Sequence, residues 1–171
     1  MKISPTQPAA RRWRIRLGDE SGVAITEFAL VLPILALLLF GMMEFGRAIN
    51  YWIDATHLAN ETARWAVVNQ NPGSGLVPAQ TLQQYIKNQA TTNELRAGGT
   101  GSVPVGIAGT ICFPSGTAAV GQPVRAKASV TYHWLPFIGN SIGLGSTTIT
   151  GRADMRLEAL PTNYTADAGP C

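Results

Sequence analysis

Residues 21–43 read SGVAITEFALVLPILALLLFGMM, and this stretch determines how the rest of the chain must be organised. It holds one charged residue, Glu27, and no charge follows within the stretch. The 21 residues from Val23 to Met43 would form about 32 Å of α-helix, enough to cross a hydrocarbon core of about 30 Å. The stretch therefore predicts a membrane-spanning helix over residues 23–43.

The basic residues gather ahead of this helix. Five Lys or Arg precede Gly22, against two acidic residues, whereas the remainder of the chain carries eight of each sign. Lys and Arg directly before an apolar segment predict a cytoplasmic N-terminus, although an unstructured tail without a targeting role is the alternative. The neutral remainder has no basic stripe, which argues against nucleic-acid binding. We therefore expect a basic leader over residues 1–22 and a domain beyond the membrane over residues 44–171.

The helix is predicted to continue beyond the membrane over residues 44–68, because no proline occurs there. Mostly small side chains recur at spacings of three and four, which predicts a packed face. This face would consist of Ala48, Trp52, Ala55, Ala59, Thr62 and Ala66. A second stripe, predicted to face solvent, would consist of Asn50, Asp54, His57, Glu61 and Arg64. Ion pairs are expected between Glu44 and Arg47 and between Glu61 and Arg64.

The rest of the chain predicts a small antiparallel sheet. A second helix is expected over about residues 80–96, followed by strands over about 103–113, 123–135 and 147–158. The second of these strands alternates between apolar and polar side chains, as a half-buried strand does. Its apolar side would consist of Val124, Ala126, Ala128, Val130, Tyr132 and Trp134. The C-terminal half of the long helix is the nearest candidate to cover this side, so we predict an α+β fold with a long N-terminal helix packed on the sheet; the sequence does not decide what the middle of the helix packs on.

Both cysteines, Cys112 and Cys171, lie beyond the membrane segment. In an oxidising compartment they could form a disulfide that ties down the C-terminal residues; two unpaired thiols are the alternative. Such a bridge requires the fold to bring the two Cα atoms within about 7 Å of each other.

The sequence offers little that could support catalysis. His57 and His133 stand alone without metal-ligand spacing, and no phosphate-binding loop, nucleophile elbow or CxxC pair occurs. We therefore predict a protein that is not an enzyme and needs no metal or cofactor. Glu27 remains as a candidate functional residue. A carboxylate at a membrane boundary either has a function or reaches the lipid headgroups at small cost.

The residues around Glu27 resemble a known signal. Gly22, the four residues after it and Glu27-Phe28 are similar to the class III signal of type IV pilin-like proteins. The longer string GVAITEFALVLPILALLLFGMMEFGRA, together with ANETAR at 59–64 and the two alternating strands, resembles TadE/TadF minor pilins of the tight-adherence (Tad, Flp) pilus system. The resemblance implies a pilin-like fold and a role in pilus biogenesis, adherence or secretion.

The resemblance also implies a processing site and an assembly site. A prepilin peptidase would cut between Gly22 and Val23, which makes Glu27 the fifth residue of the mature chain. Glu27, followed by Phe28, would then neutralise the new amine of a neighbouring subunit. The implied partners are this peptidase, other pilin and minor pilin subunits, the Tad inner-membrane assembly platform and membrane lipid. The implied location is the bacterial inner membrane, single-pass, with the C-terminal domain in the periplasm and a possible place in the pilus itself.

Two alternatives belong to other functional classes. The first is an uncleaved, permanently anchored periplasmic adaptor or sensor whose sheet binds a ligand. The second is a membrane-tethered hydrolase, for which the sequence offers almost no residue support.

Overall fold

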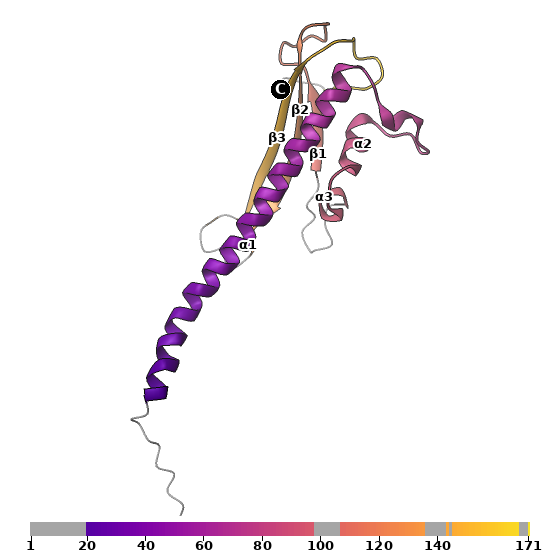
Figure 1. The fold of residues 1–171 in the computed structure, drawn as a ribbon. Helices are drawn as coiled ribbons and strands as arrows, with labels where there is room; N and C mark the ends of the chain where they lie inside the picture. The colour runs from indigo at the N-terminus through magenta and orange to yellow at the C-terminus, as the bar shows by residue number, and fades with distance from the viewer. Residues whose placement is uncertain (1–19, 98–106, 136–142, 144, 168–170) are drawn as a thin grey trace, which may run out of the picture. The chain divides into compact units, whose positions relative to one another are not determined.

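The computed structural model describes residues 20–97, 107–135, 143, 145–167 and 171. It divides the chain into two compact units, Met1–Gly41 and Met42–Cys171, and each is described here by itself. Most of the predicted leader, residues 1–19, lies outside the described residues, as does the start of the first predicted strand, residues 103–106. Figure 1 shows the elements in chain order.

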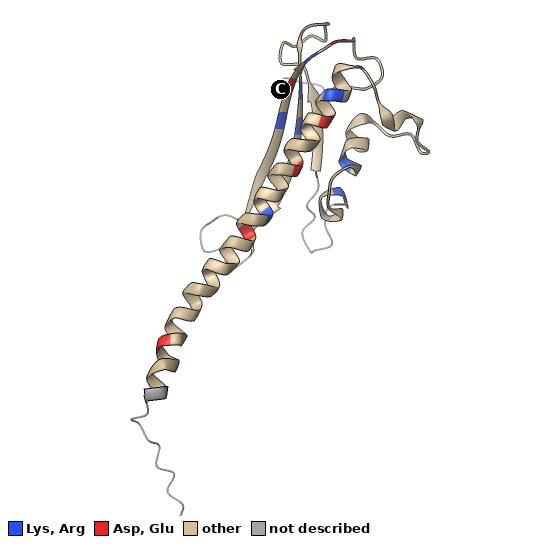
Figure 2. Ribbon diagram, in the orientation of Figure 1, with Lys and Arg blue, Asp and Glu red and all other residues tan. Residues whose placement is uncertain are grey.

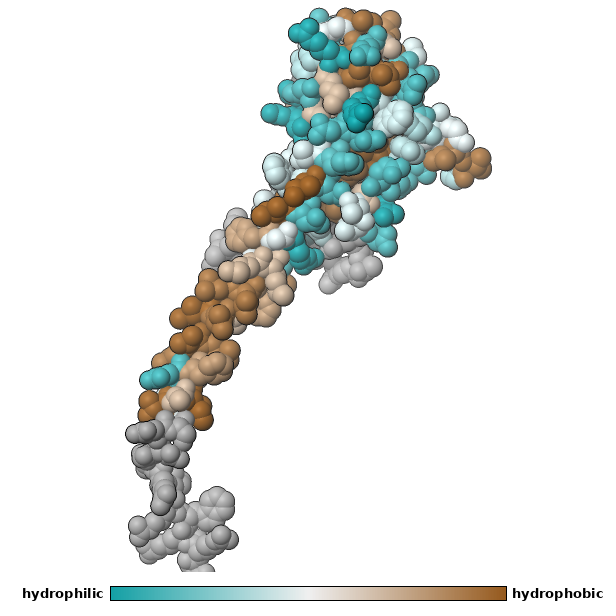
Figure 3. All heavy atoms as spheres, viewed as in Figure 1, coloured by the Kyte–Doolittle hydropathy of each residue, from teal (hydrophilic) through white to brown (hydrophobic). Residues whose placement is uncertain are grey.

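The first unit contains the beginning of the helix α1, which runs from Glu20 to Val67 and includes Pro33. Between Gly22 and Phe40 every side chain is exposed except the half-buried Ala36. Figure 3 shows the apolar character of this part of α1. By length and hydropathy α1 is the one described helix that could cross a membrane.

The second unit is built on a three-stranded antiparallel sheet. Its strands are β1 (Ile107–Cys112), β2 (Pro123–His133) and β3 (Ser146–Arg156), with β2 in the centre. The predicted alternation along β2 is confirmed by a row of buried side chains. These are Val124, Ala126, Ala128, Val130 and Tyr132. The C-terminal part of α1 covers this side of the sheet, so the predicted α+β fold is confirmed (Figure 1).

The packed face of α1 differs from the predicted one by a small rotation of the helix. Trp52, a member of the predicted packed face, is 55% exposed, whereas Tyr51 is buried and lies edge-on to Tyr132 with ring centroids 5.4 Å apart. Asp54, predicted to face solvent, is 6% exposed. The buried row on this part of α1 consists of Tyr51, Ala55, Leu58, Ala59, Thr62, Ala63, Ala66 and Val67.

A glycine in β3 explains why the helix takes this rotation. A Cβ atom built on Gly151 would lie 2.3 Å from the backbone C and O atoms of Ala55 and from the N atom of Thr56. The backbones of α1 and β3 are therefore nearly in contact, which only glycine permits at this position. The neighbouring positions across the sheet, Ala128 and Ala126, are also small and fully buried. A large side chain such as Trp52 cannot fit against this surface.

The predicted helix over residues 80–96 is wrong as a single element, because it divides into α2 (Leu82–Asn88) and α3 (Asn93–Ala97). Thr92 accepts a hydrogen bond from the Leu95 N–H at 3.2 Å and so caps the start of α3. Asp54 accepts hydrogen bonds from both the N–H and the hydroxyl of Thr91, at 3.1 and 2.6 Å. These side chains satisfy backbone groups in the break between the two helices and hold it against α1.

The contact at Gly151 generates a prediction about stability. Gly151→Ala should lower the free energy of unfolding by about 1–3 kcal/mol, the usual range for overpacking a core, because helix and strand must separate. Urea unfolding of the full chain in detergent micelles, followed by near-UV circular dichroism, measures this change.

The matched control is Gly109→Ala in β1. A Cβ atom there would meet Gln83 Cβ at 3.7 Å, an ordinary contact, so the expected change is within about 0.5 kcal/mol. Equal effects of the two substitutions would contradict the assigned role of Gly151.

Candidate processing and assembly site

The candidate processing residues lie in the first turns of α1. Gly22 and Val23 are both exposed, and the Thr26 hydroxyl donates a 2.7 Å hydrogen bond to the Val23 carbonyl oxygen. The φ angle of Gly22 is not in the left-handed region, and a Cβ atom there would meet nothing within 4 Å. Neither backbone conformation nor packing in this structure therefore requires a glycine at position 22.

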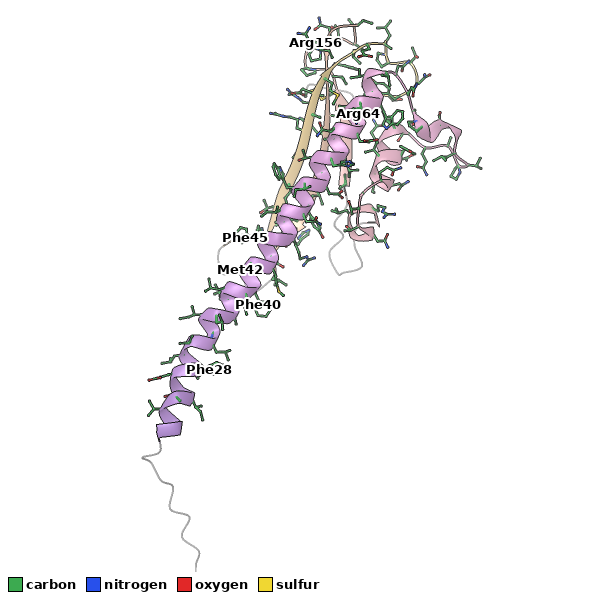
Figure 4. All side chains as sticks on the ribbon, in the orientation of Figure 1. Phe28, Phe40, Met42, Phe45, Arg64 and Arg156 are labelled. Atoms are coloured by element: carbon green, nitrogen blue, oxygen red, sulfur yellow. A yellow bond between two sulfur atoms is a disulfide. The ribbon has the colours of Figure 1, made fainter. Side chains whose placement is uncertain are left out.

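Glu27 follows one turn later on the same helix. It is the only charged residue between Gly22 and Met43 (Figure 2). Its side chain is exposed and has no hydrogen bond or ion pair with any residue that the structure describes. Phe28 beside it is 62% exposed (Figure 4). The described part of the chain therefore provides Glu27 with no partner for its charge.

A second carboxylate, Glu44, follows the apolar segment and is in the opposite situation. It is 3% exposed, and its Oε2 atom accepts a 2.8 Å hydrogen bond from the Tyr132 hydroxyl. The Leu135 N–H lies 3.4 Å from the same atom, and the predicted ion pair with Arg47 is confirmed at 3.5 Å. Glu44 thus ties the helix to the end of β2, immediately after the predicted membrane segment.

The hydrogen bond between Tyr132 and Glu44 is buried by the side chains around Tyr132. Burial and the hydrogen bond to Glu44 raise the pKa of Tyr132 well above its usual value, so its hydroxyl stays a donor. Trp134 lies edge-on to Tyr132, with ring centroids 5.0 Å apart, and Phe45 lies edge-on to Trp134 at 5.6 Å. Sequence reasoning placed Tyr132 on the buried side of β2, but did not find its partner. The available signal was that a buried tyrosine hydroxyl usually requires an acceptor.

Asp167 and Cys171 are both bonded to β1. Cys112 and Cys171 form a disulfide, with Cα atoms 5.6 Å apart. Asp167 and Ile111 exchange two hydrogen bonds: the Asp167 N–H donates to the Ile111 carbonyl at 2.8 Å, and the Ile111 N–H donates to the Asp167 carboxylate at 2.7 Å. These contacts cover the outer edge of β1.

The outward side of the sheet carries a two-bond ion pair between neighbouring strands. Arg125 Nε and Nη2 donate to the two carboxylate oxygens of Asp154 at 2.6 and 2.9 Å. The hydrogen bonds from Arg125 hold the pKa of Asp154 below its usual value, and that of Arg125 is raised by the same pair. Because both groups reach solvent, this pair aligns the strands and contributes little stability.

The two histidines are not drawn into a common site. His57 is exposed and His133 is half-buried. Within the described residues, no group of three His, Cys, Asp or Glu side chains could hold a metal ion.

The Glu44 contact generates a prediction that uses two buried tyrosines. Tyr132→Phe should lower the free energy of unfolding by about 1.5–3 kcal/mol, because it removes a hydrogen bond to a buried carboxylate. The control is Tyr164→Phe, since the buried hydroxyl of Tyr164 has no partner among the described residues. That substitution should leave stability unchanged or raise it, as measured by urea unfolding of the full chain. A larger loss in the Tyr164 variant would contradict this assignment.

The same control predicts a dependence on pH. Burial raises the pKa of Tyr164 to about 12, against about 10 for an unfolded tyrosine. The stabilising contribution of the neutral hydroxyl is therefore complete below pH 10 and is lost as the pH rises toward 12. The free energy of unfolding should fall by up to about 1.4 kcal/mol per pH unit from this residue. Unfolding at pH 9 to 11 should show a weaker fall in Tyr164→Phe than in the unsubstituted chain.

Similarity to a known protein family was found within α1. Residues 22–64 match the sequence model of the family described as TadE-like protein. No curated protein and no solved structure matches the chain. The matched span begins at Gly22 and covers both the exposed apolar part of α1 and most of the part that packs on the sheet. One N-terminal apolar helix fits a single-pass membrane protein. The predicted resemblance is therefore confirmed: residues 22–64 are TadE-like, and this match supports the assignment of the chain as a TadE-like protein of the Tad pilus system.

Proposed function

We propose that the chain is a non-catalytic minor pilin, or pseudopilin, of a Tad (Flp) pilus, cut by a prepilin peptidase and assembled through its apolar N-terminal helix. The observation that carries this proposal is the TadE-like match, which begins at Gly22 and includes the apolar segment 22–43, in which Glu27 is the one acid. That acid, Glu27, has no partner among the described residues. The protein would support pilus biogenesis, adherence or secretion.

Processing would occur at the peptide bond between Gly22 and Val23. Hydrolysis consumes one water, leaves a carboxylate on Gly22 and gives Val23 a free amine, which is mostly protonated at pH 7. Packing does not explain the glycine, because a Cβ atom there would meet nothing within 4 Å. The fold gives no reason for a glycine at position 22. A peptidase whose binding site has no room for a larger side chain would give one.

Assembly would use the charge that processing creates. When apolar helices pack together, the Val23 ammonium group enters surroundings of low dielectric constant, where an unpaired charge is costly. Glu27 of a neighbouring subunit supplies the opposite charge, and the exposed Phe28 next to it supplies apolar surface. The apolar segment would thus face lipid before assembly and other helices afterwards.

The proposed location follows from this mechanism. The leader would stay in the cytoplasm, the helix would cross the inner membrane and the second unit would lie in the periplasm. The disulfide between Cys112 and Cys171 suits an oxidising compartment of this kind. The proposed partners are the prepilin peptidase, other pilin and minor pilin subunits, the Tad assembly platform and membrane lipid.

The first test concerns processing. Expression of the full chain with its cognate peptidase should give a protein whose intact mass begins at Val23. Gly22→Val should keep the full-length mass while still inserting in the membrane, because the fold tolerates a side chain at this position. A chain that stays full length with an active peptidase would favour the uncleaved adaptor or sensor instead.

The second test concerns assembly. Glu27→Gln should abolish or strongly reduce piliation in a strain that lacks the chromosomal copy, while insertion and processing stay normal. Electron microscopy of the cells measures piliation, and fractionation measures insertion. Glu61→Gln is the matched control, since Glu61 lies on the same helix and accepts a hydrogen bond from the Trp65 ring N–H. Normal piliation in the Glu27 variant would remove this residue from its proposed role.

A further inference from the structure

Two hollows in the surface of the second unit adjoin at Trp65, near the C-terminal end of α1. Trp65 is half-buried: it packs against the core, yet it lines both hollows. Their volumes are about 270 and 460 Å³, and the larger lies within the usual range of ligand sites, about 300–1,000 Å³. Figure 4 labels Arg64, the residue before Trp65, and so locates this surface. A tryptophan ring beside hollows of this size indicates a candidate ligand site.

The ring of Trp65 is held in place by its own helix. Its Nε1–H donates a 3.2 Å hydrogen bond to Glu61 Oε1, one turn earlier on α1. The polar edge of the ring therefore already has its acceptor, and what remains for a ligand is the flat ring surface. The face of an aromatic ring carries partial negative charge. It therefore attracts C–H groups that a neighbouring oxygen has made slightly positive.

The walls of the larger hollow come from segments that hydrogen bonds tie together. Asn69, with a φ angle of 54°, follows the end of α1. Its side-chain oxygen accepts hydrogen bonds from the N–H groups of Thr162 and Asn163 at 2.8 and 2.9 Å. On the other side, Asn71 caps the 3₁₀ helix η1 (Pro72–Gly75). The hollow is therefore formed by the fold itself, so a ligand would require little further ordering of the chain.

Both hydrogen-bond donors and acceptors remain free around the ring. Arg64 is exposed and forms no ion pair with any residue that the structure describes, so its predicted pair with Glu61 is not formed. The side-chain amide of Gln70 is exposed and also has no partner in the described part of the chain. Asn163 donates through its side-chain nitrogen to the Asn69 carbonyl at 2.9 Å, which leaves its Oδ1 atom as an acceptor.

The lining of the two hollows indicates the class of ligand. Its charged residues are Glu61 and Arg64, whose opposite charges disfavour a phosphate or another anion. Its aliphatic residues are Val68 and Pro72, too few for an apolar ligand. The end of α1 and η1 offer no strand edge with which an extended peptide could pair. The lining therefore favours a neutral, polar molecule with one apolar face.

We propose that this surface binds a saccharide, with one sugar ring stacked on Trp65. A pyranose ring presents C–H groups on its face, which pack on the aromatic ring. The hydroxyl groups around its rim each donate and accept hydrogen bonds. Arg64, Gln70 and Asn163 supply donors and acceptors for these hydroxyls. The binding requires neither cleavage at Gly22 nor a pilus, so it goes beyond the proposed function and is tested separately from it.

Saturation-transfer NMR of the full, uncleaved chain tests the proposal. The chain is held in phosphocholine micelles, because maltoside and glucoside detergents would themselves add sugars. The probes are methyl glycosides of glucose, galactose, mannose and N-acetylglucosamine, with their short oligomers. Saturation should reach the C–H protons of one ring face in at least one probe. Trp65→Ala should weaken the binding of that probe about tenfold, whereas Trp65→Tyr, which keeps an aromatic face, should bind within a few-fold of the unsubstituted chain.

The matched control is Trp52→Ala, which should bind the probe unchanged, because Trp52 is exposed on the same helix and lines neither hollow. Gln70→Ala should weaken binding several-fold without changing urea unfolding, since its side chain is exposed and unbonded in the described part of the chain. This variant keeps the test decisive if Trp65→Ala does not fold.

Three results would overturn the proposal. They are no saturation transfer to any saccharide probe, equal binding by the unsubstituted chain and both the Trp65→Ala and Gln70→Ala variants, and an equal loss of binding in Trp52→Ala. Transfer to an uncharged, end-capped tetrapeptide but to no saccharide would assign the surface to a peptide instead.

Discussion

The contact between Gly151 and Ala55 is the constraint on which the rest of the second unit depends. A backbone-to-backbone approach of this kind leaves no freedom in how α1 rotates, because only the side of the helix with Ala55 and Ala59 is flat enough to touch β3. Once this rotation is set, Tyr51 must enter the core and Trp52 must leave it. The small side chains bury little area each, and larger buried side chains such as Tyr51, Leu58 and Tyr132 share the same core.

The same rotation determines which charged side chains of α1 are buried. Asp54 turns inward to the break between α2 and α3, where it accepts two hydrogen bonds from Thr91. Glu44 turns inward to the end of β2, where Tyr132 donates to it. A buried carboxylate is tolerated when its oxygens are satisfied in this way. The internal packing of the domain therefore removes both carboxylates from the outer surface of the helix.

Sequence periodicity was sufficient to predict the main helix and strands, but it was insufficient to predict how α1 is rotated against the sheet. The alternation in β2 and the length of the apolar segment are local properties, and they predicted the α+β fold correctly. The stripe from Ala48 to Ala66 was compatible with two neighbouring rotations, with either Tyr51 or Trp52 inward. Choosing between them requires Gly151, almost one hundred residues later. The division of the helix over residues 80–96 was missed for a related reason, since Asp54, which holds the break, lies 37 residues earlier than Thr91. Gly22 and Glu27 could be singled out because their spacing is itself the signal.

The two glutamates at the ends of the apolar segment show how one helix can serve two purposes. Glu44 has its hydrogen bonds and its ion pair supplied by the chain, so its charge is already compensated when the domain folds. Glu27 has none of these among the described residues, so its charge remains available to another molecule. Burying an uncompensated carboxylate costs several kcal/mol, so under the proposed function a cation of a neighbouring subunit must reach Glu27 before apolar helices enclose it. Compensation of Glu44 within the chain then belongs to folding, and the compensation proposed for Glu27 would belong to assembly.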